Sequence, residues 1–359
     1  MRADGAHPAQ GAETGRRGVW RQAFKRFLVT AFFVLFAAFF VKFARTVDWA
    51  AVAQALRAYP AGTLAAAACL AALSHLLYSS FDLIGRLRTG HGLGVARVCA
   101  ITFVSYAFNL NLGSLVGGFA TRYRLYTRDG LTAGTVTRVL MLSIVTNWLG
   151  YAFLGGLVLA LSPPSLSASW AIGSVALRTI GAVLLACSLA YVAACAAWKG
   201  RVWTIRGRQF ELPSASIALW QLAVSSVNWA VIASIIHVLL KQQLPYPTVL
   251  SVLLVAAVAG VITHVPAGLG VLEAVFLAAL SGVLGHAEII AALLAYRAVY
   301  YLLPLVVASA LFAALEATKA GGGLRVGLAR QPLQDSVPFA ISKPARTKPR
   351  PAGVNQSRT

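Results

Sequence analysis

The sequence predicts an all-α protein that crosses a membrane several times, and three observations support this fold class. Of its 359 residues, 58% are hydrophobic and 11% are charged, and the mean hydropathy is +0.74; soluble domains do not have this composition. Several apolar runs approach the roughly 20 residues that a helix needs to cross about 30 Å of hydrocarbon. Finally, lysines and arginines gather between alternate runs, which is typical of cytoplasmic loops.

Six apolar runs are regular enough to predict full transmembrane helices. They lie at residues 27–44, 62–84, 139–161, 174–198, 215–240 and 289–315. The basic stretch before the first run is also typical of a signal peptide. That alternative stays open, although Lys42 and Arg45 follow closely and no clean small-residue cleavage site does. Both interpretations place the amino terminus in the cytoplasm.

Two further apolar regions, 98–119 and 248–285, are interrupted by glycine and polar residues. Five stretches hold 25 of the 31 lysines and arginines: 1–26, 85–97, 120–138, 199–214 and 316–359. If 98–119 crossed the membrane, the arginines of 120–138 would lie outside, against this bias. We therefore predict that 98–119 enters and leaves on the cytoplasmic side and 248–285 on the outer side, as two opposed re-entrant hairpins. The runner-up is eight simple spans with glycine or proline kinks.

The stretch VITHVPAGLGVLEAVFLAAL, residues 261–280, places polar and helix-breaking groups where lipid-facing residues are expected. Pro266 ends a helix, and Gly268 with Gly270 permits a turn. Non-helical backbone at membrane depth persists only where protein or a water-filled cavity surrounds it. Two interrupted segments that enter from opposite sides are typical of transporters. We therefore predict that both segments meet around a hydrophilic cavity.

Glu273 is the most informative single residue, because an ionisable group within a membrane segment indicates a functional site. Arg297 lies about 12 Å into the last predicted span and is the expected partner of Glu273. A purely structural ion pair is the alternative. His264 lies within the break and titrates near physiological pH in its ordinary state. The site predicted for this region consists of His264, Pro266, Gly268, Gly270, Glu273 and Arg297.

The stretch NLNLGSLVGGFATRYRLYTRDG, residues 109–130, supplies a second candidate site on the cytoplasmic side. Free backbone amides at Gly117 and Gly118, beside the guanidinium groups of Arg122 and Arg124, suit the phosphate of a lipid headgroup. Interfacial anchoring of both arginines is the alternative.

Three other polar residues within the apolar runs are given structural roles. Asp82 precedes Arg86 by four residues, which predicts ordinary pairing along one helix. His75 and Asn228 lie in the middle of predicted spans and are expected to form hydrogen bonds between helices.

Other classes of function find little support in the sequence. The basic residues lack the aromatic interleaving of a nucleic-acid surface. The sequence contains no Walker loop, GxSxG, HExxH or paired CxxC motif. The four cysteines, all within apolar segments, are expected to be core residues. We therefore expect no metal, no cofactor and no enzyme activity, and membrane lipids as the partners, with a lipid-modifying enzyme encoded nearby as a further candidate.

Three stretches, taken in order, resemble one known family. They are GGFATRYRLYTRDGLTAGTVTRVLMLSIVTNWLG (117–150), PAGLGVLEAVFLAAL (266–280) and YRAVYYLLPL (296–305). They are similar to the lysylphosphatidylglycerol synthase transmembrane-region family, also called the flippase-like domain family, over roughly 27–315. The resemblance implies a bacterial inner-membrane protein similar to the translocating half of the multiple peptide resistance factor. That half moves aminoacylated phosphatidylglycerol between leaflets.

The resemblance also bears on individual residues and on the domain organisation. Phe119 departs from the small or acidic residue expected there, which leaves the substrate in doubt. We expect a membrane domain at 27–318 between disordered basic cytoplasmic tails at 1–26 and 319–359, without the family's synthase domain. Residues on the family's motif positions are Gly117, Gly118, Arg122, Pro266, Gly268, Gly270, Glu273 and Arg297.

The function expected from these observations is translocation of a polar-headed phospholipid, anionic or aminoacylated, between leaflets. Two alternatives stay open. One is a non-transporting scaffold for a lipid-modifying or glycosyltransferase enzyme, and the other is an enzyme that acts on lipid-linked phosphate.

Overall fold

The structure, a computed structural model, describes residues 34, 49–163, 173–198, 201–205, 208–263, 268 and 270–328. In this part of the chain helices dominate, which confirms the predicted fold class. A short hairpin of β1 (Val202–Ile205) and β2 (Arg208–Glu211) is the exception, and its two strands pair antiparallel. The predicted first span at 27–44, apart from residue 34, and the amino-terminal tail lie outside the described residues.

Seven helices in the described part are long and apolar enough to cross a membrane. Five of them coincide with predicted spans. They are α3 (Ala61–Ser79) with α4 (Phe81–Thr89), α7 (Ala133–Leu161), α8 (Ser174–Ala197), α9 (Ala215–Leu239), and α12 (His286–Arg297) joined through η3 (Ala298–Leu302) to α13 (Leu303–Leu328). The other two, α5 (Val95–Leu112) and α10 (Tyr246–Thr263), belong to the regions predicted as hairpins.

The chain divides into two units, residues 1–313 and 314–359. The described part of the second unit continues helix α13 to Leu328, past the predicted domain boundary at residue 318. The first unit contains both hairpins. The short helix α2 (Trp49–Arg57) precedes α3 in this unit and packs against α12.

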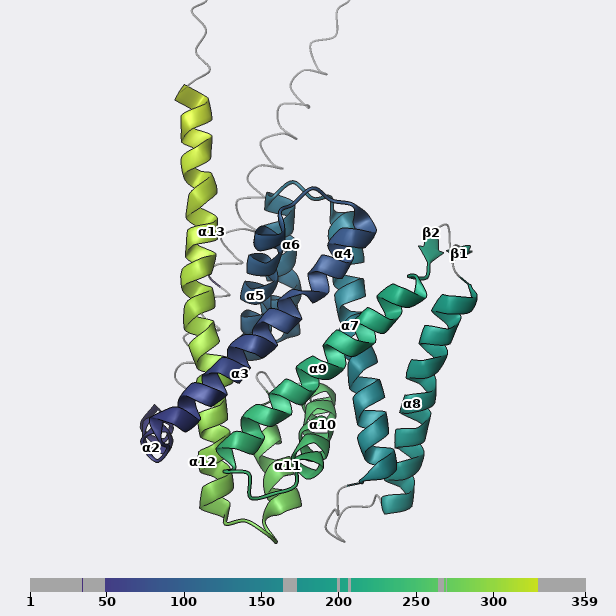
Figure 1. The fold of residues 1–359 in the computed structure, drawn as a ribbon. Helices are drawn as coiled ribbons and strands as arrows, with labels where there is room; N and C mark the ends of the chain where they lie inside the picture. The colour runs from purple at the N-terminus through teal and green to yellow at the C-terminus, as the bar shows by residue number, and fades with distance from the viewer. Residues whose placement is uncertain are drawn as a thin grey trace, which may run out of the picture. The chain divides into compact units, whose positions relative to one another are not determined.

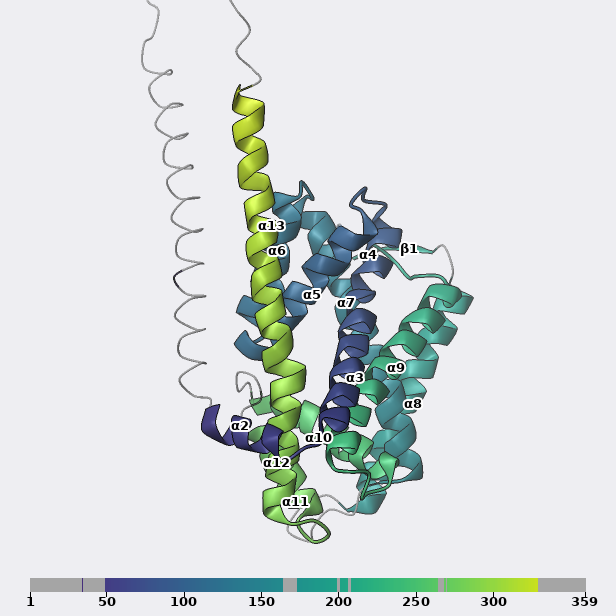
Figure 2. The same ribbon diagram turned by 60° about the vertical axis from the view of Figure 1, so that its left-hand side comes forward.

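Both interrupted regions form helical hairpins. Helix α5 ends at Gly113 and is followed by the π-helix η1 (Ser114–Ala120) and α6 (Thr121–Arg128), which pack back against it. Likewise, α10 packs against α11 (Val271–Leu280), which follows the break. Figures 1 and 2 show the α5–α6 hairpin toward one end of the helix bundle and the α10–α11 hairpin toward the opposite end.

The same order of elements therefore occurs twice in the first unit. A long helix, a hairpin and a second long helix appear as α3–α4, α5–α6 and α7, and again as α9, α10–α11 and α12. The single helix α8 separates the two sets, so the second set runs in the opposite direction through the bundle (Figure 1). Inverted repeats of this kind are typical of transporters that bind substrate where the two halves meet.

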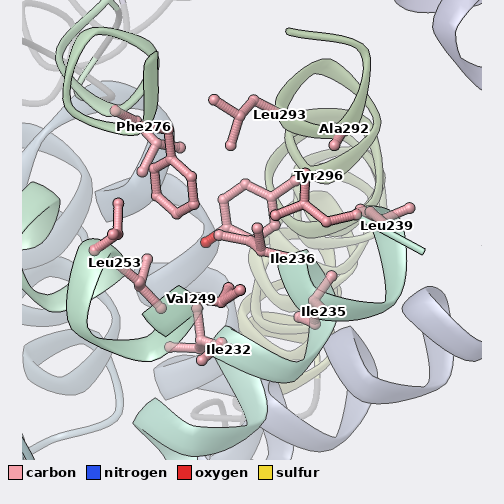
Figure 3. Packing of buried hydrophobic residues seen from close by; sticks show 14 of the residues in the cluster. Ile232, Ile235, Ile236, Leu239, Val249, Leu253, Phe276, Ala292, Leu293 and Tyr296 are labelled. Carbon is pink, nitrogen blue, oxygen red and sulfur yellow. The ribbon is translucent and has the colours of Figure 1, made fainter. Parts of the chain in front are cut away.

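Close packing holds the bundle together, because lipid is as apolar as leucine and gives helices little hydrophobic reason to associate. A Cβ atom on Gly150 would lie 2.3 Å from the Ser225 Cβ, and one on Gly156 would lie 2.6 Å from the Leu185 nitrogen. Helix α7 therefore approaches α9 and α8 at backbone distance. The largest core cluster joins α9, α10, α11 and α12, with the Tyr296 ring at its centre in Figure 3.

Candidate functional site

A cavity of about 590 Å³ lies where the two hairpin turns approach each other. The residues that line it include 113–116 of the first hairpin and Gly268, Val271 and Leu272 of the second. This geometry confirms that both irregular segments border one cavity. Aromatic residues from α5, α9, α12 and η3 complete much of the wall: Tyr106, Trp229, Tyr296, Tyr300 and Tyr301.

The character of the wall differs from the prediction. Most lining residues are aliphatic or aromatic, and the polar ones are mainly Asn109, Ser114 and the tyrosines. Among the described residues, the charged candidates are not part of this wall; Gly268 is the predicted site residue that lines it. The prediction of a hydrophilic cavity is therefore wrong, and the charged side chains of Arg122, Glu273 and Arg297 are in ion pairs instead.

Glu273 and Arg297 form the first of these pairs, as predicted. The Arg297 Nε donates to Glu273 Oε1 at 2.6 Å, and its Nη2 donates to Oε2 at 3.0 Å, so the contact is bidentate. The two side chains are only 18% and 10% exposed, respectively. Paired nitrogens on a planar guanidinium match the carboxylate geometry and make this a strong contact.

The same pair fixes the turn that borders the cavity. Gly270 has a φ of +80°, a left-handed conformation that favours glycine, and its amide donates to Glu273 Oε2 at 3.0 Å. The Arg297 Nη2 also donates to the Gly268 carbonyl at 3.1 Å, and its guanidinium lies 5.6 Å from the Tyr301 ring centre. Arg297 on α12 thus holds both the turn and the start of α11. His264 and Pro266 lie outside the described residues.

A second buried ion pair ties the first hairpin to α4. The Arg122 Nε on α6 lies 3.5 Å from Asp82 Oδ2, with side chains 5% and 0% exposed. The Tyr126 hydroxyl donates to the same Oδ2 at 2.8 Å. Arg122 also stands over the Tyr78 ring at 5.6 Å, and its Nη1 donates to Ser143 Oγ at 3.4 Å.

The expected Asp82–Arg86 pair is wrong. In the structure Arg86 Nε donates to the Leu93 carbonyl at 2.7 Å, while Asp82 turns inward to Arg122 on α6. The sequence contained a signal for this site. Asp82 and Glu273 are the two acidic residues within the eight apolar regions, and each meets an arginine. The partner of Asp82 lies forty residues away, beyond the reach of helix spacing.

Gly117 and Gly118 have a packing role rather than the predicted phosphate-binding one. The Gly117 amide donates to the Gly113 carbonyl at 2.9 Å, so a free amide there is ruled out. A Cβ atom on Gly117 would lie 2.1 Å from the Phe108 carbonyl oxygen, and one on Gly118 would lie 2.8 Å from Asn109 Oδ1. These glycines let η1 lie directly on α5. Arg124, also on α6, is partly exposed.

A chain of hydroxyl groups runs from the cavity wall into the bundle. Ser74 Oγ donates to Asn228 Oδ1 at 2.7 Å, which confirms the predicted interhelical role of Asn228. Because this uses the one hydroxyl hydrogen of Ser74, the Tyr300 hydroxyl at 2.9 Å donates to Ser74. By the same reasoning, the Tyr106 hydroxyl donates to Tyr300, also at 2.9 Å. The Tyr106 oxygen, at the cavity end, thus retains its acceptor capacity.

Replacing Gly117 with alanine is expected to destabilise the first hairpin by several kcal/mol, above the ~1–3 kcal/mol typical of overpacking, because the added methyl meets backbone. Thermal unfolding of the detergent-purified protein measures this effect. Gly62→Ala, at a helical glycine with open space around its Cβ position, is the matched control and is expected to be neutral. Equal melting temperatures for the two variants would contradict the close approach of η1 and α5.

Helices of membrane-spanning length and two hairpins around a cavity define a multi-pass α-helical membrane protein. The chain belongs to the family described as the lysylphosphatidylglycerol synthase TM region, which matches residues 26–308. The predicted resemblance is therefore confirmed.

Two relatives match most of the chain, and a third matches a shorter part of it. Inner membrane protein YbhN of Escherichia coli is 45% identical over 298 residues, which cover 83% of this chain and 93% of that protein. The protein slr0712 of Synechocystis is 30% identical over 258 residues, covering 70% and 79%. Phosphatidylglycerol lysyltransferase of Staphylococcus haemolyticus is 29% identical over 89 residues, which is 24% of this chain but 11% of that protein.

Proposed function

We propose that this protein is a lipid translocase of the bacterial inner membrane that moves a polar-headed phospholipid, anionic or aminoacylated, between leaflets. The observation that carries this proposal is the cavity of about 590 Å³ bordered by the turns of both hairpins. The location follows from the spanning helices and from similarity to an inner membrane protein of Escherichia coli. Both termini are assigned to the cytoplasm by the distribution of basic residues.

The short arm of each hairpin supports re-entry rather than crossing, whereas the long arms α5 and α10 have 18 residues each. Helix α11 has 10 residues and α6 has 8, which correspond to about 15 Å and 12 Å at about 1.5 Å per residue. Neither arm covers the roughly 30 Å of hydrocarbon. In this proposal each hairpin therefore turns back within the membrane, where its turn meets the cavity.

The cavity wall suits a headgroup that carries a hydrogen-bond donor or a positive charge. Tyr106 presents an acceptor oxygen there, because its own hydrogen is committed to Tyr300. The faces of Tyr296, Tyr301 and Trp229 attract a cation through their π-electrons. The aliphatic part of the wall accommodates the first carbons of the lipid, while the acyl tails stay in the bilayer.

The inverted pair of hairpins gives this cavity two routes of access. Each hairpin is fastened by one buried ion pair to a long helix, through Asp82 and Arg122 at one end and through Glu273 and Arg297 at the other. Loosening one hairpin while the other stays closed opens the cavity to one leaflet at a time. This is alternating access in the form that inverted repeats permit.

Reconstitution tests the proposal directly. Liposomes that contain the purified protein and a headgroup-labelled phospholipid are expected to move the label between leaflets at least tenfold faster than empty liposomes. An impermeant quencher added outside measures the rate, with phosphatidylglycerol, lysylphosphatidylglycerol and phosphatidylethanolamine compared. Folded, inserted protein that moves none of these lipids above the empty control would overturn the proposal and favour the accessory-protein alternative.

A further inference from the structure

Three titratable side chains follow one another along α3, α4 and the turn after α4. They are His75, Asp82 and His91, and each has a buried nitrogen or oxygen atom that finds no hydrogen-bond partner among the described residues: His75 Nε2, Asp82 Oδ1, and both ring nitrogens of His91. The first two side chains are 2% and 0% exposed. Buried polar atoms are almost always paired, so three in one row call for an explanation.

His75 begins this row behind two tyrosines of the cavity wall and does not itself line the cavity. Its ring centre lies 5.2 Å from that of Tyr106 and 5.0 Å from that of Tyr300, and both tyrosines line the cavity. The His75 Nδ1 lies 2.9 Å from the Ala71 carbonyl and donates to it, since that oxygen only accepts. The Nε2 lone pair is therefore available to receive a proton that arrives from the cavity side.

Asp82 lies seven residues further, about 10 Å along the helix axis. Its Oδ2 accepts from Tyr126 and meets Arg122, whereas Oδ1 is the atom without a partner. A charged carboxylate held by one ion pair at 3.5 Å is incompletely compensated for its burial. The titratable and charged groups around Asp82 are Arg122 and Tyr126 on α6, Tyr78 on α3, Arg86 on α4, Cys99 on α5, and His91.

His91 ends the row in the turn between α4 and α5. Its ring centre lies 6.3 Å from that of Tyr126, the residue that donates to Asp82. Burial lowers the pKa of His91, the positive charge of Arg86 lowers it further, and Asp82 opposes the shift. A lowered pKa means that His91 binds a proton weakly, so a proton that reaches it is released readily to water.

We propose that Asp82 binds the proton whose movement drives lipid translocation, with His75 supplying it from the cavity and His91 releasing it at the cytoplasmic end. A proton from water in the cavity binds His75 Nε2 and forms an imidazolium. It passes through water to Asp82 Oδ1, which becomes a neutral carboxyl while His75 returns to neutral. The proton then moves to His91 and into bulk water, which restores the Asp82 carboxylate.

The coupling follows from the ion pair that Asp82 makes. While Asp82 is charged, it holds Arg122 and therefore the α5–α6 hairpin against α4. Protonation removes the carboxylate charge and releases the hairpin, so each proton opens the cavity once. This inference rests on the proposed function, because it names the energy source of the same cavity.

Liposomes with a pH-sensitive dye inside and a headgroup-labelled phospholipid test both parts at once. An imposed proton gradient is expected to speed lipid movement at least fivefold and to acidify the lumen, and a protonophore should remove the acceleration. Asp82→Asn should abolish both the gradient-driven lipid movement and the acidification of the lumen, and Asp82→Glu should restore both in part. His75→Gln and His91→Gln should each lower both rates tenfold. Glu288→Gln and His286→Gln, which are changes in the first turn of α12, are the matched controls and should behave as wild type.

The outcomes separate the two claims. Lipid movement that ignores the gradient in wild-type protein would overturn the proton proposal and leave translocation standing. Proton uptake that depends on Asp82 without lipid movement would support the path and overturn the proposed function. An apolar carbodiimide, which reacts with protonated buried carboxyls, adds an independent readout. Peptide mapping should find Asp82 modified increasingly as pH falls, and no modification at any pH would count against proton binding there.

Discussion

Replacement of Arg297 by alanine is expected to unfold the second hairpin and abolish lipid movement. The change removes three hydrogen bonds, two to Glu273 and one to the Gly268 carbonyl. It also leaves the partly buried Glu273 carboxylate, 18% exposed, without its cation. Loss of one partner of a fully buried pair costs about 3–5 kcal/mol, and the partial exposure of Glu273 lowers this cost. The turn at Gly268 and Gly270 then loses the side chain that fixes it.

A double-mutant cycle in thermal unfolding measures the contribution of the pair. Glu273→Ala, Arg297→Ala and the double variant should show a coupling free energy of about 1.5–3 kcal/mol, since contacting charged residues are not additive. The double variant should be more stable than Arg297→Ala alone, because no unpaired carboxylate is left. Arg178→Ala on α8 is the control, and strict additivity at 273 and 297 would contradict the bidentate geometry.

The sequence allowed the helical fold, the two interrupted regions and the Glu273–Arg297 pair to be predicted. Each depends on information local to a stretch of chain. Apolar run length predicts a spanning helix, glycine and proline predict a break, and a lone charge within such a run requires a partner in the same low-dielectric surroundings. Arg297 was identified because one basic residue lies inside the last long span.

The predictions that failed depend on how distant segments pack. Asp82 was assigned to Arg86 by helix spacing, but the fold brings Arg122 to it from another helix. Gly117 was predicted to bind an anion. In the structure it has a packing role, because the Phe108 carbonyl leaves no room for a Cβ atom at this position. The aromatic wall comes from α5, α9, α12 and η3, and single residues spread over four elements leave no local pattern.

The two ion pairs have different places in the inverted repeat, because one joins its hairpin to the helix before it and the other joins its hairpin to the helix after it. Asp82–Arg122 joins α4 to the first hairpin, and Glu273–Arg297 joins the second hairpin to α12. They differ in how well each carboxylate is satisfied. Glu273 uses both oxygens with Arg297, while Asp82 keeps one oxygen without a partner in the described structure. Of the two carboxylates, Asp82 is therefore the less completely paired.

Filling the cavity is expected to stop lipid movement without unfolding the protein. Ala257 on α10 lines the cavity and is partly exposed to it. In the Ala257→Trp variant, an indole side chain of about 150–250 Å² of surface would occupy much of the space between the hairpin turns. Because the cavity of about 590 Å³ already exists, the added ring displaces no packed core residue, and the melting temperature should change little.

The liposome assay checks this expectation against a matched substitution. Ala190→Trp adds the same ring at an exposed position of α8, away from the cavity lining, and should move lipid at the wild-type rate. The rate of lipid movement in the Ala257→Trp variant should fall at least tenfold, to the rate of empty liposomes. The size-exclusion profiles of both variants should match that of the parent protein. A full rate in Ala257→Trp would show that the headgroup takes another route, because a headgroup cannot pass through space that a rigid indole fills.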